Sequence, residues 1–166
     1  MTIRQEQCSD CDRKHHDPIQ REWTEELPSL SPPECGLLVQ SEGRRLLDKY
    51  GLEEWRIEIG PKTKQWLGQC DRLRKSIDIS QCFIDAAPTL DILQDLILHE
   101  IAHALTSGGH NFEWKRKYAE LLAHHFDASK VTEFLDNDRY CRKHMTRLLS
   151  ELYCTSESRH VGPSNK

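Results

Sequence analysis

Residues 90–105 read LDILQDLILHEIAHAL, and two residues later the chain continues with Gly108-Gly109-His110. Apolar residues lie on most sides of the first pattern, which predicts a helix buried in a core, with Thr89 as its cap. His99 and His103 stand four residues apart, so their imidazoles lie on one face of that helix, one turn apart. The stretch therefore predicts a core helix that carries two potential metal ligands.

Two imidazoles in this arrangement can bind one zinc ion at roughly 2.0 to 2.1 Å, and zinc then needs a third protein ligand. We expect His110 to be that ligand, because the preceding glycine pair lets the chain fold back towards the helix. Glu100 lies about 100° around the helix from His99, so we expect it to act as a general base on a water at the metal rather than as a ligand.

The alternative interpretation is that these histidines only pack in a core. It would leave three polar side chains uncompensated inside an apolar helix, at a cost of about 1 to 3 kcal/mol each. A bound metal ion removes most of that cost, so we favour the zinc site.

The rest of the chain predicts an α+β fold. Alternating apolar and polar residues predict three strands, which lie close enough in sequence to form an antiparallel meander. Helical periodicity predicts further helices, the first ended by Gly51 and another capped by Asn111. The expected strands cover residues 55–59, 66–70 and 76–80, and the expected helices cover 35–50, 112 to about 125, and 129–152.

Four segments together resemble the SprT-like (Spartan-related) zinc metallopeptidase domain in their order and spacing: LGQC at 67–70, SIDIS at 76–80, LILHEIAHAL at 96–105 and GHNFEWK at 109–115. The resemblance covers roughly residues 37–126. It implies a small zincin-like domain, in which a three-stranded antiparallel sheet packs on the HExxH helix and flanking helices. It also implies Zn²⁺ held by His99, His103 and His110, with Glu100 as the catalytic base.

On this basis we divide the chain into residues 1–34, a polar N-terminal tail and linker; 35–127, the metallopeptidase domain; 128–154, a C-terminal helical extension; and 155–166, a disordered tail. The family includes proteases that degrade proteins crosslinked to DNA. The resemblance therefore implies a zinc metalloendopeptidase with protein substrates, and single-stranded DNA or DNA-bound proteins as further partners. The competing hypothesis is a non-catalytic zinc-binding accessory protein that binds DNA or a protein partner.

Composition narrows the class of protein. The 166 residues carry a formal net charge of −4 and contain no apolar run long enough to cross a membrane. The N-terminal residues lack the apolar segment of a secretion signal, so we expect an intracellular protein, cytoplasmic or associated with the nucleoid or nucleus. Seven cysteines without such a signal argue against a disulfide framework.

Two weaker patterns remain open. Cys8 and Cys11 form one Cys-x-x-Cys pair, which is half of the ligand set of a structural zinc site. Cys141, His144 or Cys154 could be the distant partners of a second zinc site, although two reduced thiols are the simpler interpretation. Basic residues flank the expected active site and predict weak DNA binding if they form one face, whereas solvated surface charge is the alternative. These residues are Arg72, Arg74, Lys75, Lys115, Arg116 and Lys117.

Overall fold

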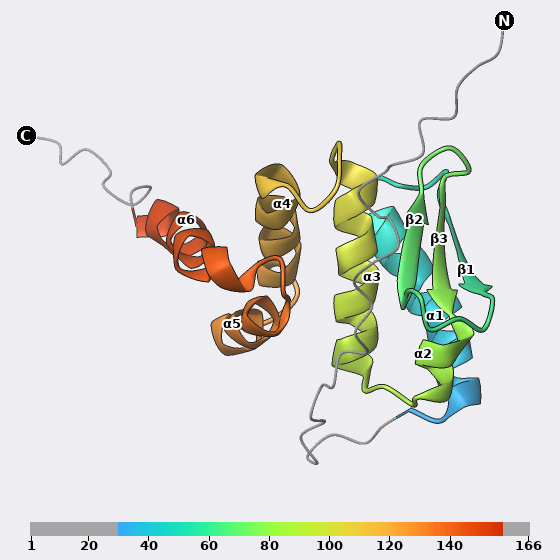
Figure 1. Cartoon of the computed structure of the whole chain (residues 1–166). Coiled ribbons are helices and arrows are strands. Elements are labelled where there is room, and N and C mark those ends of the chain that lie inside the picture. Colours follow the sequence, from blue (N-terminus) through green and yellow to red (C-terminus); the bar gives the residue numbers. More distant parts are fainter. Residues whose placement is uncertain (1–29, 158–166) are drawn as a thin grey trace, which may run out of the picture. The chain divides into compact units, whose positions relative to one another are not determined.

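The computed structural model describes residues 30–157, with side chains described through Tyr153, and the chain divides into two compact units at Gly109 and His110. Most of the expected N-terminal tail, including Cys8 and Cys11, lies outside the described residues. In chain order the elements are α1 (Pro32–Lys49), β1 (Arg56–Gly60), β2 (Gly68–Asp71), β3 (Ser76–Ser80), α2 (Gln81–Asp85), α3 (Leu90–Leu105), α4 (Phe112–Ala123), α5 (Ala128–Asn137), the 3₁₀ turn η2 (Arg142–His144) and α6 (Met145–Glu157) (Figure 1).

The sheet of the first unit is mixed, so the predicted all-antiparallel meander is wrong. The strand order is β1-β3-β2, with β3 in the middle. β1 pairs with β3 in parallel, with Ile57 opposite Ile77, whereas β2 pairs with β3 antiparallel, with Cys70 opposite Ile77. The α+β class and all three strands are confirmed. The error lies in which strands are neighbours.

The connection between β1 and β2, residues 61–67, explains this order. It passes the C-terminal end of β3, where the Ser80 amide donates to the Leu67 carbonyl at 2.8 Å and the Ser80 hydroxyl donates to the Thr63 carbonyl at 2.7 Å. A connection of this length, begun by a proline, does not form the tight hairpin that would place β1 beside β2. It leaves room for β3 between them.

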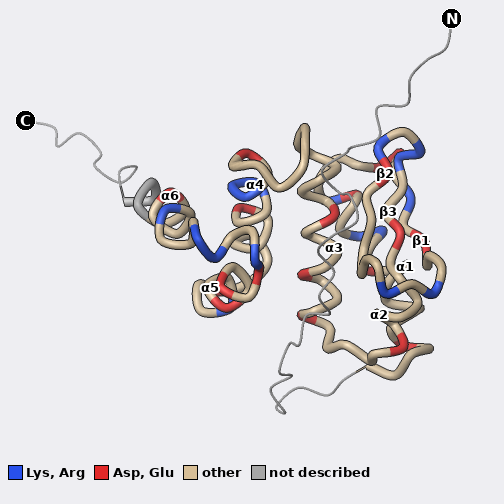
Figure 2. Tube along the Cα trace, in the orientation of Figure 1, with Lys and Arg blue, Asp and Glu red and all other residues tan. Residues whose placement is uncertain are grey.

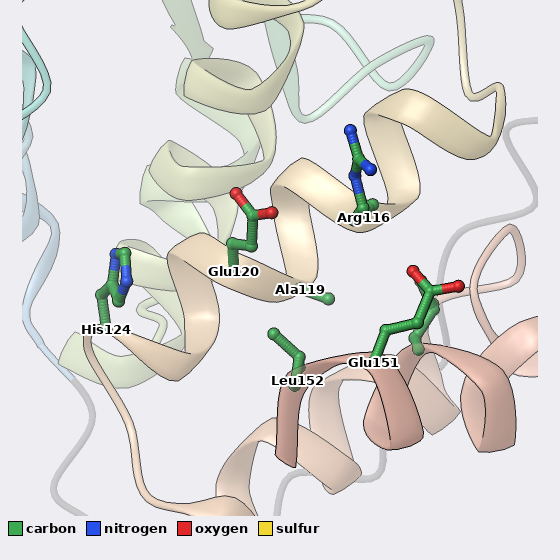
Figure 3. A pocket seen from close by; sticks show the side chains of 7 residues that line it. Arg116, Ala119, Glu120, His124, Glu151 and Leu152 are labelled. Atoms are coloured by element: carbon green, nitrogen blue, oxygen red, sulfur yellow. The ribbon is translucent and has the colours of Figure 1, made fainter. Parts of the chain in front are cut away.

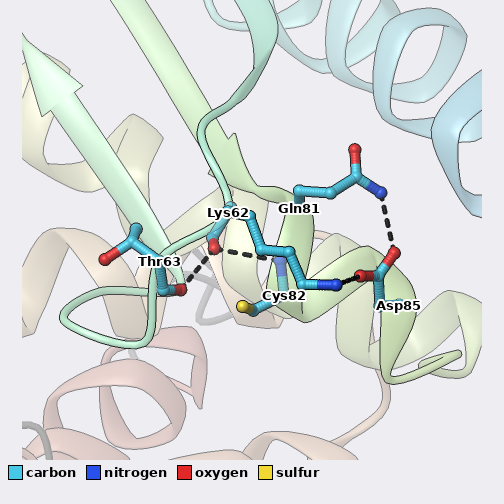
Figure 4. Close-up of polar contacts among 6 residues, drawn as sticks. Lys62, Thr63, Gln81, Cys82 and Asp85 are labelled. Carbon is cyan, nitrogen blue, oxygen red and sulfur yellow. Dashed lines mark hydrogen bonds and ion pairs between the residues drawn. The ribbon is translucent and has the colours of Figure 1, made fainter.

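The same connection is also tied to α2, as Figure 4 shows. The Lys62 ammonium lies 2.7 Å from the Asp85 carboxylate, and the Gln81 amide donates to the same carboxylate at 2.9 Å. The Cys82 amide donates to the Ser80 hydroxyl and begins α2 immediately after β3. Exposed ion pairs of this kind contribute little stability.

Two helices pack with the sheet. α1 contacts β1, α3 contacts β2 and β3, and the two helices contact each other. The core of this unit is apolar and completely buried, with Leu46 of α1, Ile77 and Ile79 of β3, and Ile97 and Ile101 of α3 at 0% exposure. As predicted, the Thr89 side chain caps α3 by accepting from the Ile92 amide, and Gly51 follows α1 with a positive φ of 72°.

The second unit consists of helices. α4, α5 and α6 contact one another, and Trp114, Leu122 and Val131 are completely buried among them. Asn111 caps α4 as predicted, accepting from the Trp114 amide at 2.9 Å. The expected continuous helix over residues 129–152 is interrupted after Asn137, and residues 138–141 form an irregular turn between α5 and η2. None of the described helices is long and apolar enough to span a membrane.

Candidate metal centre

His99 and His103 lie in the last two turns of α3, as the four-residue spacing predicts. Their ring centroids are 5.2 Å apart. His103 is buried with 7% of its surface exposed, and His99 is half-buried. α3 therefore presents both imidazoles on one face, at an edge of the core rather than inside it.

His110 joins these two residues in one cluster. Each of the three histidines offers a ring nitrogen, and these atoms all lie within 4.8 Å of one another. The turn before His110 requires glycine at Gly108, whose φ is 86°. Three neighbouring imidazoles form the donor set that zinc and similar divalent ions prefer, and a fourth position then remains for water or substrate. The cluster can hold a metal ion.

Glu100 is almost completely buried, with 5% of its surface exposed, and it is not part of the ligand cluster. Burial raises the pKa of its carboxyl to about 8. A divalent cation nearby would act in the opposite direction, because it favours the carboxylate. A desolvated carboxyl whose proton affinity is shifted towards neutrality suits a group that accepts and returns a proton.

Gly68, the first residue of β2, leaves the space that Glu100 occupies. A Cβ atom at Gly68 would stand 2.8 Å from Oε1 of Glu100 and 2.9 Å from its Cγ. Both distances are too short for a real contact, so any side chain here would displace the carboxylate. The backbone of β2 therefore lies close to Glu100, and the lack of a side chain at Gly68 makes room for the carboxylate.

Arg72 holds the end of α3. Its guanidinium donates to the His103 carbonyl from Nε at 2.9 Å and from Nη2 at 2.7 Å, and Nη2 also reaches the carbonyls of Thr106 and Gly108. The His103 carbonyl lies in the last turn of α3, where a cation is favourable because it faces the negative end of the helix dipole. Burial, with a smaller effect of the Arg72 charge, lowers the pKa of His103 to about 4 and so keeps its imidazole neutral, the form that binds metal.

His110 is half-buried and contacts two aromatic side chains of its own unit. Its ring stacks on Tyr140 with a centroid distance of 3.5 Å and an interplanar angle of 7°. Trp114 meets the same imidazole edge to face at 4.4 Å. Trp114 in turn stacks on Tyr118, and both side chains are buried. The third histidine is therefore held by contacts as well as by its turn.

Sequence reasoning found the three histidines and Glu100, and it missed Gly68, Arg72 and Tyr140 as parts of their surroundings. Arg72 was interpreted as a surface cation for DNA. The signal for Gly68 was present, since a glycine inside a strand often marks a close backbone approach. No local pattern marks Arg72 or Tyr140, because both act on residues distant in sequence.

The structure adds little support for a second zinc site or for a DNA-binding face. Among the described side chains, the group that can hold an ion is the histidine cluster, and Cys141 and His144 are not in it. Basic residues gather at the turn between β2 and β3 (Figure 2), where Lys75 pairs with Glu54. In the second unit, Lys117 pairs with Glu120 at 2.6 Å. Whether the two groups form one face remains a prediction.

The second unit also contains a hollow between α4 and α6 (Figure 3), with a volume of about 300 Å³. Its lining includes the charged residues Arg116, Glu120 and Glu151 and the apolar residues Leu148 and Leu152. It contains none of the three clustered histidines and no group that the proposed chemistry uses.

Comparison with known proteins gives no match to a family model, to a curated protein or to a solved structure. The family resemblance is therefore a proposal.

Proposed function

We propose that this protein is a zinc-dependent metalloendopeptidase of the SprT-like type. The observation that carries the proposal is the combination of a three-histidine cluster with a buried carboxyl, Glu100, that belongs to the same helix and is not one of the clustered ligands. A purely structural zinc site is closed by four protein ligands and has no use for a base beside it. Three imidazoles leave one position open, as catalytic zinc sites do.

Each residue of the site would have a separate role in the proposed hydrolysis. His99, His103 and His110 would hold the ion, and a zinc ion bound there would polarise the scissile carbonyl and the attacking water. Glu100 accepts a proton from that water at a carboxylate oxygen and returns it to the departing amine nitrogen. Arg72 keeps the end of α3 in place, and Gly68 leaves the space that the carboxylate of Glu100 occupies.

β2 offers a place for an extended substrate. It pairs with β3 and lies at an edge of the sheet as far as the described strands go. An extended peptide that added to this edge would receive backbone hydrogen bonds from β2 and pass close to Glu100, because the Glu100 side chain fills the space where a side chain at Gly68 of β2 would lie. This arrangement favours cleavage within a flexible or unfolded protein segment.

A DNA-linked substrate is the narrower form of the proposal. It is supported by the family resemblance and by the basic turn between β2 and β3, where Arg74 and Lys75 are exposed. The net charge of −4 gives no general attraction to nucleic acid, so binding would depend on local charge and on salt.

The test is cleavage of casein and histone by the purified full chain loaded with zinc, with and without single-stranded DNA. Glu100→Gln should keep zinc and fold while cleavage falls at least ~100-fold, because only the general base is lost. Glu113→Gln, at an exposed glutamate of α4, is the matched control and should cleave normally. A wild type that binds zinc but cleaves neither protein would favour the accessory-protein hypothesis, and cleavage indifferent to DNA would remove the DNA-linked form.

A further inference from the structure

The irregular turn between α5 and η2 places one aromatic residue on the candidate metal centre. Helical periodicity continues through this region of the sequence, yet the chain leaves the helix after Asn137 and re-enters helical geometry at Arg142. Tyr140 lies in this turn and stacks on His110. The break in the helix thus coincides with a residue that stacks on a clustered histidine.

The turn is built so that Tyr140 has little freedom. The Asp138 carboxylate accepts from the amides of Tyr140 at 2.8 Å and Cys141 at 2.9 Å, which fixes the backbone on both sides of the Tyr140 side chain. The Arg139 guanidinium lies over the Tyr140 ring at 4.6 Å and donates to its hydroxyl. Tyr140 is therefore held through its backbone, its ring face and its hydroxyl, so its ring can in turn restrict the neighbouring imidazole of His110.

We propose that Tyr140 is a positioning residue for His110, and that residues 138–141 therefore belong to the metal centre. This inference rests on the proposed metal site. The two rings are nearly parallel, at 7°, so rotation of the imidazole out of this plane breaks the stacking. Trp114, meeting the same imidazole edge to face, restricts it further.

Stacking also changes when metal binds. A coordinated imidazole gives up electron density to the cation, and an electron-poor ring is attracted more strongly to the electron-rich face of a phenol. The contact is then stronger in the metal-bound protein than in the metal-free protein. Tyr140 therefore contributes to metal affinity itself and not only to the stability of the second unit.

The test compares zinc affinity, measured by competition with a chromophoric chelator, among Tyr140→Leu, Tyr140→Phe and the wild type. Leucine removes the aromatic face, so affinity should fall about tenfold, a typical effect for groups that orient a metal ligand. Phenylalanine keeps the face and should stay within about threefold of the wild type. Tyr153→Leu, at an exposed tyrosine of α6, is the matched control and should bind zinc as the wild type does.

The absorption spectrum of the cobalt-substituted protein gives a second readout. Its visible bands should change in Tyr140→Leu and remain in Tyr140→Phe, because they report the arrangement of the ligands. A leucine variant with unchanged zinc affinity and spectrum would overturn the inference. If that variant fails to fold, wild-type NMR decides instead: the ring protons of His110 should be shifted upfield by the stacked Tyr140, and unshifted resonances would overturn the inference.

The two proposals fail in different ways. If the wild type binds no zinc, or if His110→Ala binds zinc as tightly as the wild type, the three-histidine site is wrong. If His110→Ala lowers the affinity and Tyr140→Leu does not, the site stands and the role of Tyr140 falls.

Discussion

The guanidinium of Arg72 donates two hydrogen bonds to the backbone carbonyl of His103, at 2.9 and 2.7 Å, across a separation of 31 residues. This contact joins the turn after β2 to the helix that carries the metal ligands. It also extends to Thr106 and Gly108, so one side chain holds both the end of α3 and the start of the glycine turn.

Replacing Arg72 with Met should lower the free energy of unfolding by about 1 to 3 kcal/mol, because the carbonyls of α3 lose a charged donor. Arg72→Lys should recover only part of this loss, since an ammonium cannot present the same planar set of donors. Thermal or urea unfolding measures the effect. Arg74→Met, in the same turn, is the control and should change stability by less than about 0.5 kcal/mol; equal effects of the two substitutions would contradict the role of Arg72.

Gly68→Ala should impair cleavage without removing the metal. The added Cβ would meet Glu100 at 2.8 to 2.9 Å, so the carboxylate must move while the histidines need not. We expect a loss of about tenfold or more in kcat/KM, with zinc content unchanged. Gln69→Ala, at the neighbouring exposed position of β2, is the matched control. A fully active Gly68→Ala protein would show that the position of Glu100 is not critical.

Native mass spectrometry should find one zinc ion in each wild-type chain, and His110→Ala should reduce this occupancy because two histidines leave zinc under-coordinated. His124→Ala, at an exposed histidine outside the cluster, should keep the metal. A wild type with two zinc ions would instead support a second site that includes Cys8 and Cys11.

Alanine substitution at two glycines of α1 should change the free energy of unfolding in opposite directions. A Cβ at Gly43 would lie 2.4 Å from Cδ1 and 2.8 Å from Cγ2 of Ile57, so Gly43→Ala should destabilise the protein by about 1 to 3 kcal/mol through overpacking. At Gly36 the nearest atom is 3.5 Å away, so alanine should stabilise the helix by about 0.5 to 1 kcal/mol. Urea unfolding of both variants distinguishes packing from helix propensity, and destabilisation at both positions would contradict this account.

The parts of this fold that the sequence predicted are those fixed by local chemistry. The spacing of His99 and His103 follows from helical geometry, and the caps Thr89 and Asn111 act on amides within three residues of themselves. The turn at Asp138 was also local, because its carboxylate accepts from the amides two and three residues further along the chain, but helical periodicity on both sides concealed it.

The other parts that were not predicted depend on contacts between distant segments. Alternation of apolar and polar residues shows which face of a strand is buried, and it carries no information about which strand lies beside it. β1 and β3 have similar patterns, and only the complete burial of Ile77 and Ile79 marks β3 as central. The contacts of Arg72 with α3 and of Tyr140 with His110 are nonlocal in the same way.

The passage of residues 61–67 across the end of β3 also governs how the growing chain can assemble its sheet. β1 is synthesised first, yet its neighbour in the sheet is β3, whose pairing begins with Ser76 opposite Arg56. Until the β2–β3 hairpin exists, the backbone donors and acceptors of β1 can bond only to water or to another chain. Arg56 and Glu58 place a charge at alternate positions of β1, and such charges discourage the pairing of this still unpaired strand with other nascent chains.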